Sequence, residues 1–545
     1  MTNLLISKEK KEKKTASNSC AKALVETLLE LGVDSIFGYP GASVLSIYNE
    51  LAQKTEIRHY LVRHEQAAVH AAEGYARVKR KPGVVLVTSG PGFTNTITGI
   101  ANAHADSTPL LVLAGDVPSN NNKGKIFQKV DIISLTKTCS KKNYLVTNKD
   151  DIKQIIKDAY EIANSGQKGP VVIALPRNIL ESKYTQKLRK NLYKKKPQKI
   201  AKADIDKTIK MLKSANKPLL LLGGGSAESV DLIRNFVTKT NIPVVSTLMG
   251  IGVFPSKEDN YLGMIGINGT NSANLAIDNS DLVIALGVSF SDRSTCRKEN
   301  FTKNAKIINI NTQKSSLNFG LEITTSSNIF LKELISKIPE TINFTEWAQQ
   351  VSILKKKNAK DDSSSKCLHS SCVLKTIYEL TRSKNPIVVT DVGQHQMLTA
   401  QHFYFSQPNK FITSGGLGTM GFGLPASIGA QLATPGSLVL NITGDGSFQM
   451  NLQELATCRE HNIPIKIIIM NNGFLGMVRQ MQEKIYNSHY QVEMTNPDFT
   501  KIAEAYDLFA IRVKSSEELI PALNKAFSHN GTAIVDIAIN SRENI

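Results

Sequence analysis

The sequence predicts an α/β protein with three domains, each built on a parallel β-sheet. Short apolar runs such as Leu219–Leu222 and Ile467–Met470 recur along the chain, bounded by Gly, Pro or polar residues. Runs of this length and setting are typical of buried parallel strands. They alternate with helical patterns, and 545 residues are too many for one compact core. Strand and helix alternate in three blocks of about 140 to 180 residues, which indicates three α/β domains.

The first domain is expected over residues 17–184, after a basic tail over residues 1–16. Its clearest elements are a helical pattern and three apolar runs: Ala21–Leu31, Val84–Thr88, Leu110–Ala114 and Val171–Leu175. Residues 185–203 are polar and basic, and we expect them to form a linker.

The second domain is expected over residues 204–340 and the third over residues 367–545. The predicted strands are Pro218–Leu222, Leu282–Leu286 and Lys306–Ile310 in the second, and Ile387–Thr390, Leu438–Ile442, Ile465–Met470 and Thr532–Ile537 in the third. Residues 341–366 are expected to be a second linker, because the stretch KKKNAKDDSSSK at its end cannot bury a core.

The composition favours a globular protein without membrane spans. Hydrophobic residues make up 41% of the chain, yet no apolar run approaches the roughly 18 residues of a membrane span. The net charge of +19 raises the alternative of a nucleic-acid partner. However, the excess of lysine is concentrated at residues 8–14 and 187–199, and few aromatic residues accompany it. A solvated tail and linker are therefore favoured over a nucleic-acid site. None of the six cysteines forms a C-x-x-C pair, which favours free thiols in a reducing compartment.

Two polar clusters follow two apolar runs of the third block. Gly444-Asp445-Gly446-Ser447 comes after LVLNIT, and Asn471-Asn472 ends the run IKIIIM, 25 positions after Gly446. Both clusters are expected at the carboxyl ends of parallel strands, where open α/β sheets bind ligands. A carboxylate and an amide oxygen suit Mg²⁺, which keeps sites for phosphate or water, and glycines let a diphosphate approach the backbone. The alternative is two independent turns.

The stretch from Gly416 to Gly421 matches G-x-G-x-x-G, so a dinucleotide site is a second alternative. It fits less well, because the preceding residues Phe411–Ser414 form only a weak strand pattern. In the first block, Glu65 lies where the apolar run HYLV meets a helical pattern. A carboxylate there could exchange a proton with a bound heterocycle, or could simply favour the dipole of the helix.

Several motifs occur together in one order: GYPG, VRHEQ, TSGPG, TDVGQHQM, GGLGTMGFGLP, GDGSF and NNGFLGMVRQ. In this combination, over about residues 18–540, the chain resembles the large subunits of acetolactate synthase, a family that depends on thiamine diphosphate. The resemblance implies a pyrimidine-binding first domain, a central FAD/Rossmann-like domain and a diphosphate-binding third domain.

The resemblance also implies roles for single residues. Glu65 would bind the aminopyrimidine ring, and Met420 would bend the cofactor. Asp445, Asn472 and the carbonyl of Phe474 would hold Mg²⁺. Further contacts to thiamine diphosphate would come from Pro40, Gly41, Gly393, Gln394, His395, Gly418, Gly446, Ser447 and Met477. FAD would contact Gly223, Gly224, Thr247, Leu248, Gly266, Asp292 and Arg293. Gln128 and Lys141 would act at the substrate entrance, together with Phe127 and Arg293.

The implied reaction is decarboxylation of pyruvate and addition of the two-carbon unit to a second 2-oxo acid, pyruvate or 2-oxobutanoate. It is the first step of branched-chain amino-acid synthesis. The resemblance further implies a homodimer or tetramer, a regulatory small subunit, and a place in the bacterial cytoplasm or the plastid stroma. The alternatives are another thiamine-dependent decarboxylase or oxidase, or a catalytically weakened paralogue.

The chain departs from the family pattern at several positions. Ser289, Asn268 and Asn311 replace an Arg, a His and an Asp of the FAD domain. Met481 replaces a Trp that shapes the acceptor pocket. Ala42-Ser43 and Lys129 are further replacements, and the sequence stops at Ile545 without the family's closing tail. These departures lead us to expect weaker FAD binding, an altered acceptor preference and different gating of the site.

Overall fold

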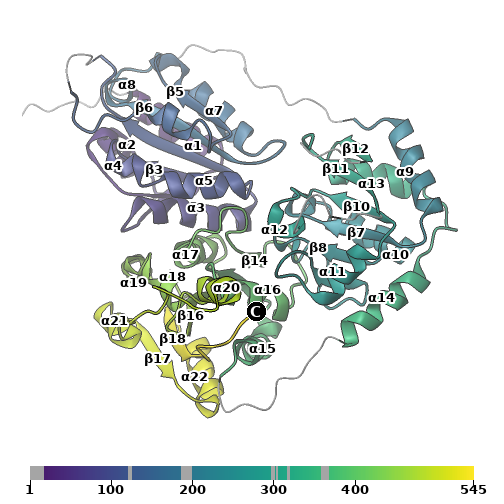
Figure 1. Cartoon of the computed structure of the whole chain (residues 1–545). Coiled ribbons are helices and arrows are strands. Elements are labelled where there is room, and N and C mark those ends of the chain that lie inside the picture. The colour runs from purple at the N-terminus through teal and green to yellow at the C-terminus, as the bar shows by residue number, and fades with distance from the viewer. Residues whose placement is uncertain are drawn as a thin grey trace, which may run out of the picture.

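The computed structural model describes residues 18–120, 125–185, 199–295, 301, 305–315, 320–357 and 368–545. Within these residues the chain forms three six-stranded sheets, and every strand pair inside them is parallel. Helices cover both faces of each sheet (Figure 1). The predicted fold class, α/β with three parallel-sheet domains, is confirmed.

The first sheet has the strand order β2-β1-β3-β4-β6-β5. Its strands are β1 (Ser35–Gly38), β2 (Arg58–Leu61), β3 (Gly83–Val87), β4 (Leu110–Asp116), β5 (Lys142–Leu145) and β6 (Pro170–Pro176). Its helices are α1 (Cys20–Glu30), α2 (Leu45–Leu51), α3 (Glu65–Lys79), α4 (Pro91–Thr94), α5 (Ile97–Ala105), α6 (Ile132–Thr136), α7 (Ile152–Ala163) and α8 (Arg177–Leu180). Alternate residues of β3 enter two cores: Val84 and Leu86 pack with α1 and α7, whereas Val85 and Val87 pack with α3 and α5.

The second sheet has the order β12-β11-β10-β7-β8-β9. Read from the other edge, this is the order of doubly wound dinucleotide-binding sheets. The strands are β7 (Pro218–Leu222), β8 (Val244–Ser246), β9 (Tyr261–Met264), β10 (Leu282–Leu286), β11 (Lys306–Asn311) and β12 (Leu321–Thr324). The helices are α9 (Lys202–Ser214), α10 (Val230–Thr240), α11 (Asn271–Asp278), α12 (Asp292–Thr295), α13 (Ser327–Lys337) and α14 (Thr345–Lys357).

The third sheet has the order β14-β13-β15-β16-β18-β17. The strands are β13 (Ile387–Thr390), β14 (Phe411–Ile412), β15 (Val439–Gly444), β16 (Lys466–Asn471), β17 (Phe509–Val513) and β18 (Ala533–Ala538). The helices are α15 (Ser370–Thr381), α16 (Gln394–His402), α17 (Gly423–Ala433), α18 (Asp445–Gln449), α19 (Leu455–Glu460), α20 (Gly476–Tyr486), α21 (Phe499–Ala505) and α22 (Ser516–Ser528).

The structure differs from the sequence-based expectation at residues 341–366. Part of this expected linker is α14, whose Trp347 and Val351 are buried in the core of the second domain. The indole Nε1 of Trp347 donates a hydrogen bond to the carbonyl of Pro218, 3.1 Å away. The lysine-rich end of the helix concealed this apolar contact in the sequence. Most of the linker expected at 185–203, the basic tail, and nearly all of both lysine clusters lie outside the described residues.

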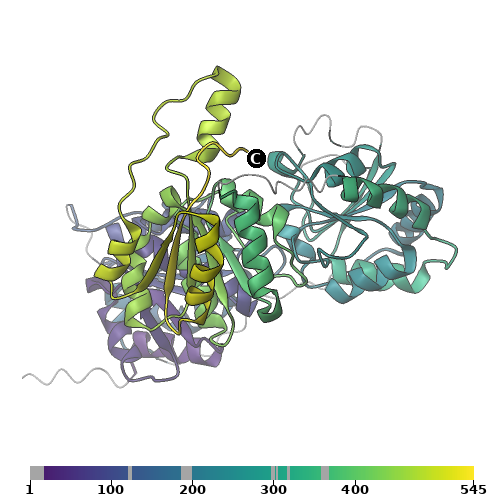
Figure 2. The ribbon, with the colours of Figure 1, turned by 90° about the horizontal axis from the view of Figure 1, so that it is seen from below.

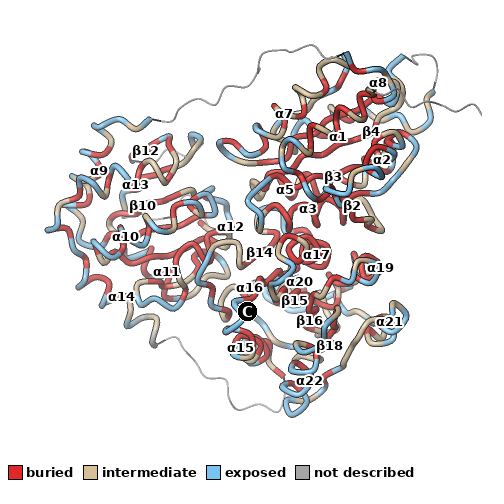
Figure 3. Tube along the Cα trace, turned by 180° about the vertical axis from the view of Figure 1, so that it is seen from behind, coloured by how far each residue is buried: buried red, intermediate tan, exposed pale blue. Residues whose placement is uncertain are grey.

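The first and third domains meet through α3 and α17, which are buried between them (Figures 1 and 3). Gly74 of α3 and Gly429 of α17 let the two backbones touch. A Cβ added to Gly74 would lie 1.9 Å from the carbonyl oxygen of Ala426, and one added to Gly429 would lie 1.8 Å from that of Ala71. Only glycine fits at these two positions, so the sequence itself fixes this close packing.

Among the described helices, none combines the length and the apolar character needed to cross a bilayer. The described cysteines form no disulfide with one another, and Cys296 and Cys367 lie outside the described residues.

Candidate active site

The two polar clusters of the third domain lie side by side at the carboxyl edge of its sheet. β15 and β16 are parallel neighbours, with Gly444 opposite Met470, so Asp445 and Asn472 follow adjacent strands. The carboxylate of Asp445 is buried and accepts hydrogen bonds from the Gly473 N–H at 3.0 Å and from Asn496 Nδ2 at 2.6 Å. Burial raises the pKa of the Asp445 carboxyl, because the charged form loses its hydration. A cation at this carboxylate would offset that loss.

Asn472 completes the polar edge beside Asp445. Its Oδ1 accepts a hydrogen bond from the Phe474 N–H at 2.9 Å, and its Nδ2 donates to Gln394 Oε1 at 3.3 Å. The amide oxygen has a second lone pair, so it can still bind a metal ion. Carboxylate, amide and carbonyl oxygens are the ligands that Mg²⁺ prefers, and the residues at this edge fit that ion.

Loops and helix starts around this edge suit a diphosphate. Helices α16 and α20 begin here, and their N-cap residues, Gly393 and Leu475, give no side-chain cap to the first N–H groups. Such free N–H groups bind anions. Gly476 is required, because a Cβ there would lie 2.1 Å from Gln394 Oε1. Gly446, Ser447 and Met477 belong to α18 and α20 at the same edge.

His395 adds a polar atom that lacks a partner. Its side chain is buried next to Gly444, and burial lowers the pKa of its imidazole to about 4. The ring is therefore neutral at physiological pH. Its Nε2 is buried and finds no hydrogen-bond partner within the described part of the chain. A phosphate oxygen would supply one.

In the first domain, Glu65 is the first residue of α3, at the carboxyl edge of the sheet. His64 caps the helix, with its Nδ1 accepting from the Gln66 N–H. Glu65 Oε2 accepts a hydrogen bond from Asn95 Nδ2 at 2.9 Å, and Gly92 leaves room beside Oε1. The carboxylate is thus held in one orientation by residues of α4 and its C-cap, which follow β3 in the chain.

The turn with Pro40 and Gly41 lies at the same edge. A Cβ added to Gly41 would come within 2.5 Å of the side chain of Thr88. Ser43, which departs from the family pattern, is buried, and its Oγ lies 2.8 Å from Thr88 Oγ1 and accepts from the Ser89 N–H. The unexpected serine therefore ties the two turns together.

Two of the four residues expected at the substrate entrance, Gln128 and Lys141, lie at opposite edges of the first sheet. Gln128 has φ +59° and packs over Gly90 after β3, at the carboxyl edge. Lys141 precedes β5, at the amino edge, and its ammonium donates hydrogen bonds to the carbonyls of Ile162 and Ser165 at the end of α7. Burial lowers the pKa of this lysine to about 8. Within one chain the structure does not bring Lys141 to Gln128. Phe127 is 85% exposed.

The residues expected to contact FAD gather at the carboxyl edge of the second sheet. Gly223 follows β7, Thr247 and Leu248 follow β8, and Gly266 follows β9. The loop after β10 joins them, since the carbonyl of Arg293 accepts from the Ile267 N–H at 3.1 Å. Gly223 and Gly224 line a close turn, in which a Cβ on Gly223 would meet the carbonyl of Gly287 at 2.1 Å. Glycine backbone without side chains at the point where the strand order reverses, between β7 and β10, fits a dinucleotide.

Of the three replacements in this domain, one makes a new side-chain hydrogen bond. Asn311 Nδ2 donates to the carbonyl of Val288 at 3.0 Å, a bond that the usual aspartate could not make. The backbone carbonyl of Asn268 accepts from Gln401 Nε2 at 2.9 Å, a contact with the third domain that does not depend on the replaced side chain. Ser289 is exposed, and so is Arg293 within α12. The chain thus keeps the loops of this edge and changes the side chains on them.

Sequence reasoning did not find Asn496 and Asn95, which orient the two key carboxylates. Asn496 Nδ2 donates to Asp445 and, at 3.0 Å, to Asn471 Oδ1. Asn95 holds Glu65 in the same way. Neither asparagine belongs to a motif, and Asn496 stands 51 positions from its partner. Glu65 and Asn95 are separated by α3, β3 and α4, so no local spacing suggested the second pair either.

Family models for thiamine pyrophosphate enzymes match all three domains of the chain. The N-terminal TPP-binding domain matches residues 18–135, the central domain 205–334 and the C-terminal TPP-binding domain 391–537. The class of protein is thus a three-domain thiamine-diphosphate enzyme. The loop Gly416–Gly421 falls within the C-terminal TPP-binding match, which disfavours the reading of this stretch as a dinucleotide fingerprint.

Individual relatives narrow the class. The chain is 40% identical to the acetolactate synthase large subunit of Haemophilus influenzae, over 97% of this chain and 95% of that protein. It is 38% identical to the acetolactate synthase isozyme 3 large subunit of Escherichia coli, over 97% and 96%. It is 36% identical to the chloroplastic acetolactate synthase of Arabidopsis thaliana, over 96% and 82%. The chain belongs to the acetolactate synthase large-subunit family.

Proposed function

We propose that the chain catalyses the acetolactate synthase reaction, in which pyruvate loses CO₂ and its two-carbon unit joins a second 2-oxo acid. One observation carries the proposal: a buried, desolvated carboxylate at Asp445 lies beside Asn472 at the edge where two uncapped helices begin. This edge has the donors for a metal-bound diphosphate. Membership of the family supports the same reaction, which is the first step of branched-chain amino-acid synthesis.

The chain's own residues have separate tasks in this proposal. Asp445, Asn472 and the Phe474 carbonyl would hold Mg²⁺, and Gly393, Gln394, His395, Gly446 and Ser447 would surround the diphosphate. Glu65 would exchange a proton with the aminopyrimidine, and Met420 would press on the middle of the cofactor. When bound, thiamine diphosphate supplies the carbon nucleophile and the ring that accepts the electrons released with CO₂. Substrate would enter near Gln128.

We infer that each site takes residues from two chains. In one chain, the loop of Met420 lies against the later turns of α3. The carbonyl of Thr413 accepts from Arg77 directly. Thr419 is linked to Glu73 through Asn102 of α5. Glu73 and Arg77 lie about 12 and 18 Å along the helix axis from Glu65. In addition, α20 projects from the carboxyl edge of the third sheet, away from the first domain (Figure 2). A Glu65 from a second chain could face this edge, which supports a homodimer or tetramer.

The further assignments rest on the same family. FAD would bind the carboxyl edge of the second sheet, as an element of structure, because the net reaction involves no oxidation. A regulatory small subunit would bind the assembled enzyme, and the compartment would be the bacterial cytoplasm or the plastid stroma. Met481, 49% exposed on α20, would widen the acceptor pocket relative to the family's Trp. Pyruvate or 2-oxobutanoate would serve as acceptor.

The test is a pyruvate-only assay of the purified chain with thiamine diphosphate and Mg²⁺, run with and without FAD. Acetolactate as the product is expected. Acetaldehyde would favour a decarboxylase, and acetyl phosphate or peroxide would favour an oxidase. Absence of turnover at saturating cofactor, with cofactor binding retained, would favour a catalytically weakened paralogue.

A further inference from the structure

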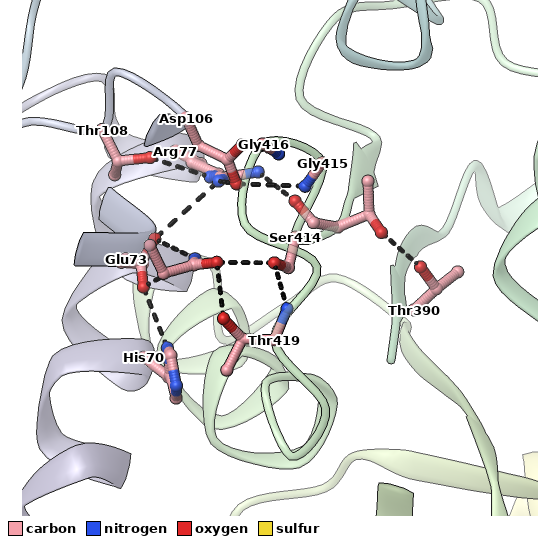
Figure 4. A network of polar contacts seen from close by, with 12 residues as sticks. His70, Glu73, Arg77, Asp106, Thr108, Thr390, Ser414, Gly415, Gly416 and Thr419 are labelled. Atoms are coloured by element: carbon pink, nitrogen blue, oxygen red, sulfur yellow. Dashed lines mark hydrogen bonds and ion pairs between the residues drawn. The ribbon is translucent and has the colours of Figure 1, made fainter. Parts of the chain in front are cut away.

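The loop over residues 413–421, which we call the Met420 loop, is held by the first domain of the same chain. Figure 4 shows it packed against α3 and α5, with a network of polar contacts between the two domains. Neither the proposed cofactor contacts nor the metal ligands account for this network. Its members are His70, Glu73, Arg77, Asn102, Asp106, Thr108, Thr390, Thr413, Ser414, Gly415, Gly416 and Thr419.

Asn102 is the central link of the network. Its Nδ2 donates to both oxygens of Glu73, at 3.1 and 2.9 Å, and its Oδ1 accepts from Ser414 Oγ at 2.5 Å and Thr419 Oγ1 at 3.1 Å. Asn102 and Glu73 are fully buried. Because the amide has donors on one end and an acceptor on the other, these partners permit only one orientation of its side chain. The loop is therefore held in one position relative to α3.

A charged pair makes the second link. Arg77 donates from its guanidinium to Asp106 Oδ2 at 2.6 Å and to the carbonyl of Thr413 at 2.7 Å. Asp106 Oδ1 accepts from the Gly416 N–H at 2.6 Å, and Oδ2 accepts from the Gly415 N–H at 3.2 Å. Both oxygens of Asp106 thus bind backbone of the Met420 loop. Charge-assisted hydrogen bonds of this kind are stronger and shorter than neutral ones.

The far end of the loop is held by the third domain itself. The buried carboxylate of Asp391 accepts from the N–H groups of Gly421 and Gly423, at 2.9 and 2.7 Å. Asn451 Nδ2 donates to the Gly421 carbonyl at 2.7 Å. Met420 lies between these contacts and those made by Thr419. The apex at Leu417 and Gly418 faces open space.

We propose that Asn102 and Asp106 are positioning residues for Met420. The side chain of Met420 is the wedge that would press on the middle of the cofactor. The first domain of each chain would thus set the position of the wedge in the third domain of the same chain. Neither residue touches the cofactor edge at Asp445; both act through the backbone and hydroxyls of residues 414–419. The inference rests on the proposed function, because the proposed function is what makes Met420 the residue that bends the cofactor. It goes beyond that function by naming residues outside the cofactor site that determine the reactivity of the bound cofactor.

The mechanism predicts a defect in reactivity rather than in binding. The diphosphate clamp of β15 and β16 does not involve the network, so affinity for thiamine diphosphate and Mg²⁺ should hold. A wedge displaced by about 1 Å should slow a step that needs close approach within the cofactor by about 10- to 100-fold. That step is removal of the proton from the thiazolium C2, which can be followed without substrate as hydrogen–deuterium exchange of the bound cofactor.

The experiment compares Asp106→Asn and Ser414→Ala with the wild-type chain and a matched control, Asp158→Asn. Asp158 is a buried aspartate of α7, on the opposite face of the first sheet, and accepts from Gln154 Nε2 at 2.9 Å. For each protein, C2 exchange is measured by NMR after acid quench, with the Kd of thiamine diphosphate at saturating Mg²⁺ and the Tm. We expect exchange to fall in the two network variants with an unchanged Kd, and to stay at the wild-type rate in the control. If Asp106→Asn does not fold, the smaller change Ser414→Ala decides.

A double-mutant cycle with Met420→Ala separates positioning from other effects. If Asp106 acts through Met420, Asp106→Asn should lower exchange by less than about 2-fold further once Met420 is Ala, because coupled residues are not additive. Wild-type exchange rates in both network variants, or an equal effect of Asp106→Asn in both backgrounds, would overturn the inference. Failure of the wild-type chain to bind the cofactor or to use pyruvate would instead overturn the proposed function.

Discussion

The first and third domains have the same strand order yet carry different chemistry at the same edge. Numbered within each domain, both sheets run 2-1-3-4-6-5. At the carboxyl edge the first domain offers Glu65, oriented by Asn95, among closely packed glycine turns. The third domain offers Asp445, oriented by Asn496, beside helix starts suited to phosphate. One topology thus fixes where a ligand binds, and the few residues after each strand decide which part of the ligand binds there.

Under the proposed function, neither domain is sufficient alone. In the proposed reaction the first domain would supply the carboxylate for proton exchange at Glu65, and the third would supply the groups that hold the diphosphate. Variants that separate proton exchange from cofactor binding therefore test whether the two domains have different tasks.

The largest effect should come from Glu65→Gln. Glutamine keeps the shape of the side chain and cannot exchange the proton, and loss of such a general acid–base group costs about 10²- to 10⁴-fold in rate. We expect kcat for pyruvate to fall by that amount while the Tm and the Kd of thiamine diphosphate change little. The measurement is acetolactate formation at saturating cofactor.

The control for Glu65→Gln is Glu26→Gln in the same domain. Glu26 lies on the surface of α1, and its carboxylate contacts Lys153 of α7. The control replacement should leave kcat unchanged. Full activity of Glu65→Gln would remove the proton-exchange role from the first domain and end the division of labour between the two domains.

Acid stability should depend on two imidazoles in particular, that of His395, which is buried in the third domain, and that of His59, which is partly buried in the first. Burial lowers the pKa of His395 to about 4, and burial with the neighbouring His461 lowers that of His59 to about 4. The folded rings stay neutral while the unfolded ones take up protons below their usual pKa of 6.5, so stability present above pH 6.5 is lost as the pH falls toward 4.

Replacing His395 with Gln should therefore flatten this pH dependence by about 3 kcal/mol. His59→Gln should do the same through the first domain. The measurement is the free energy of unfolding in urea, without cofactor, at several pH values between neutral and about pH 4. If a variant and the wild type show the same change of unfolding free energy with pH, the replaced imidazole has the same pKa in the folded and unfolded chains.

Replacing Asn496 should affect Mg²⁺ affinity, whereas replacing Asn95 should affect kcat. Asn496→Ala leaves Asp445 without its 2.6 Å donor, and loss of such an outer partner costs about 10- to 100-fold in metal affinity. We expect the Mg²⁺ concentration needed for half-maximal cofactor binding to rise by that factor. Asn95→Ala should lower kcat and leave the Mg²⁺ titration unchanged. Equal effects of both variants on the titration would contradict the separation of tasks.

The sequence predicted the architecture because parallel strands buried on both faces are apolar throughout. Pro218–Leu222, Leu282–Leu286 and Ile387–Thr390 have the predicted bounds. The pair Asp445 and Asn472 was predictable too, since each residue directly follows a strand. Asn102 and Asp106 were not, because their partners in the Met420 loop lie more than 300 positions away. The helix at Thr345–Lys357 was missed because its buried face is narrow and its surface is rich in lysine.

The smallest expected effect concerns Lys141. Its replacement tests whether this lysine binds substrate or stabilises the end of α7. Its ammonium binds two carbonyls at the end of α7, and Lys466 of the third domain likewise binds the carbonyls of His529 and Gly531 beyond α22. A cation at a helix C-terminus contributes about 0.3–2 kcal/mol. Lys141→Met and Lys466→Met should each lower the free energy of unfolding by that amount and leave the KM for pyruvate unchanged. A rise in KM for Lys141→Met alone would show that a second chain brings this lysine to the substrate, because within its own chain it lies at the far edge of the sheet from Gln128.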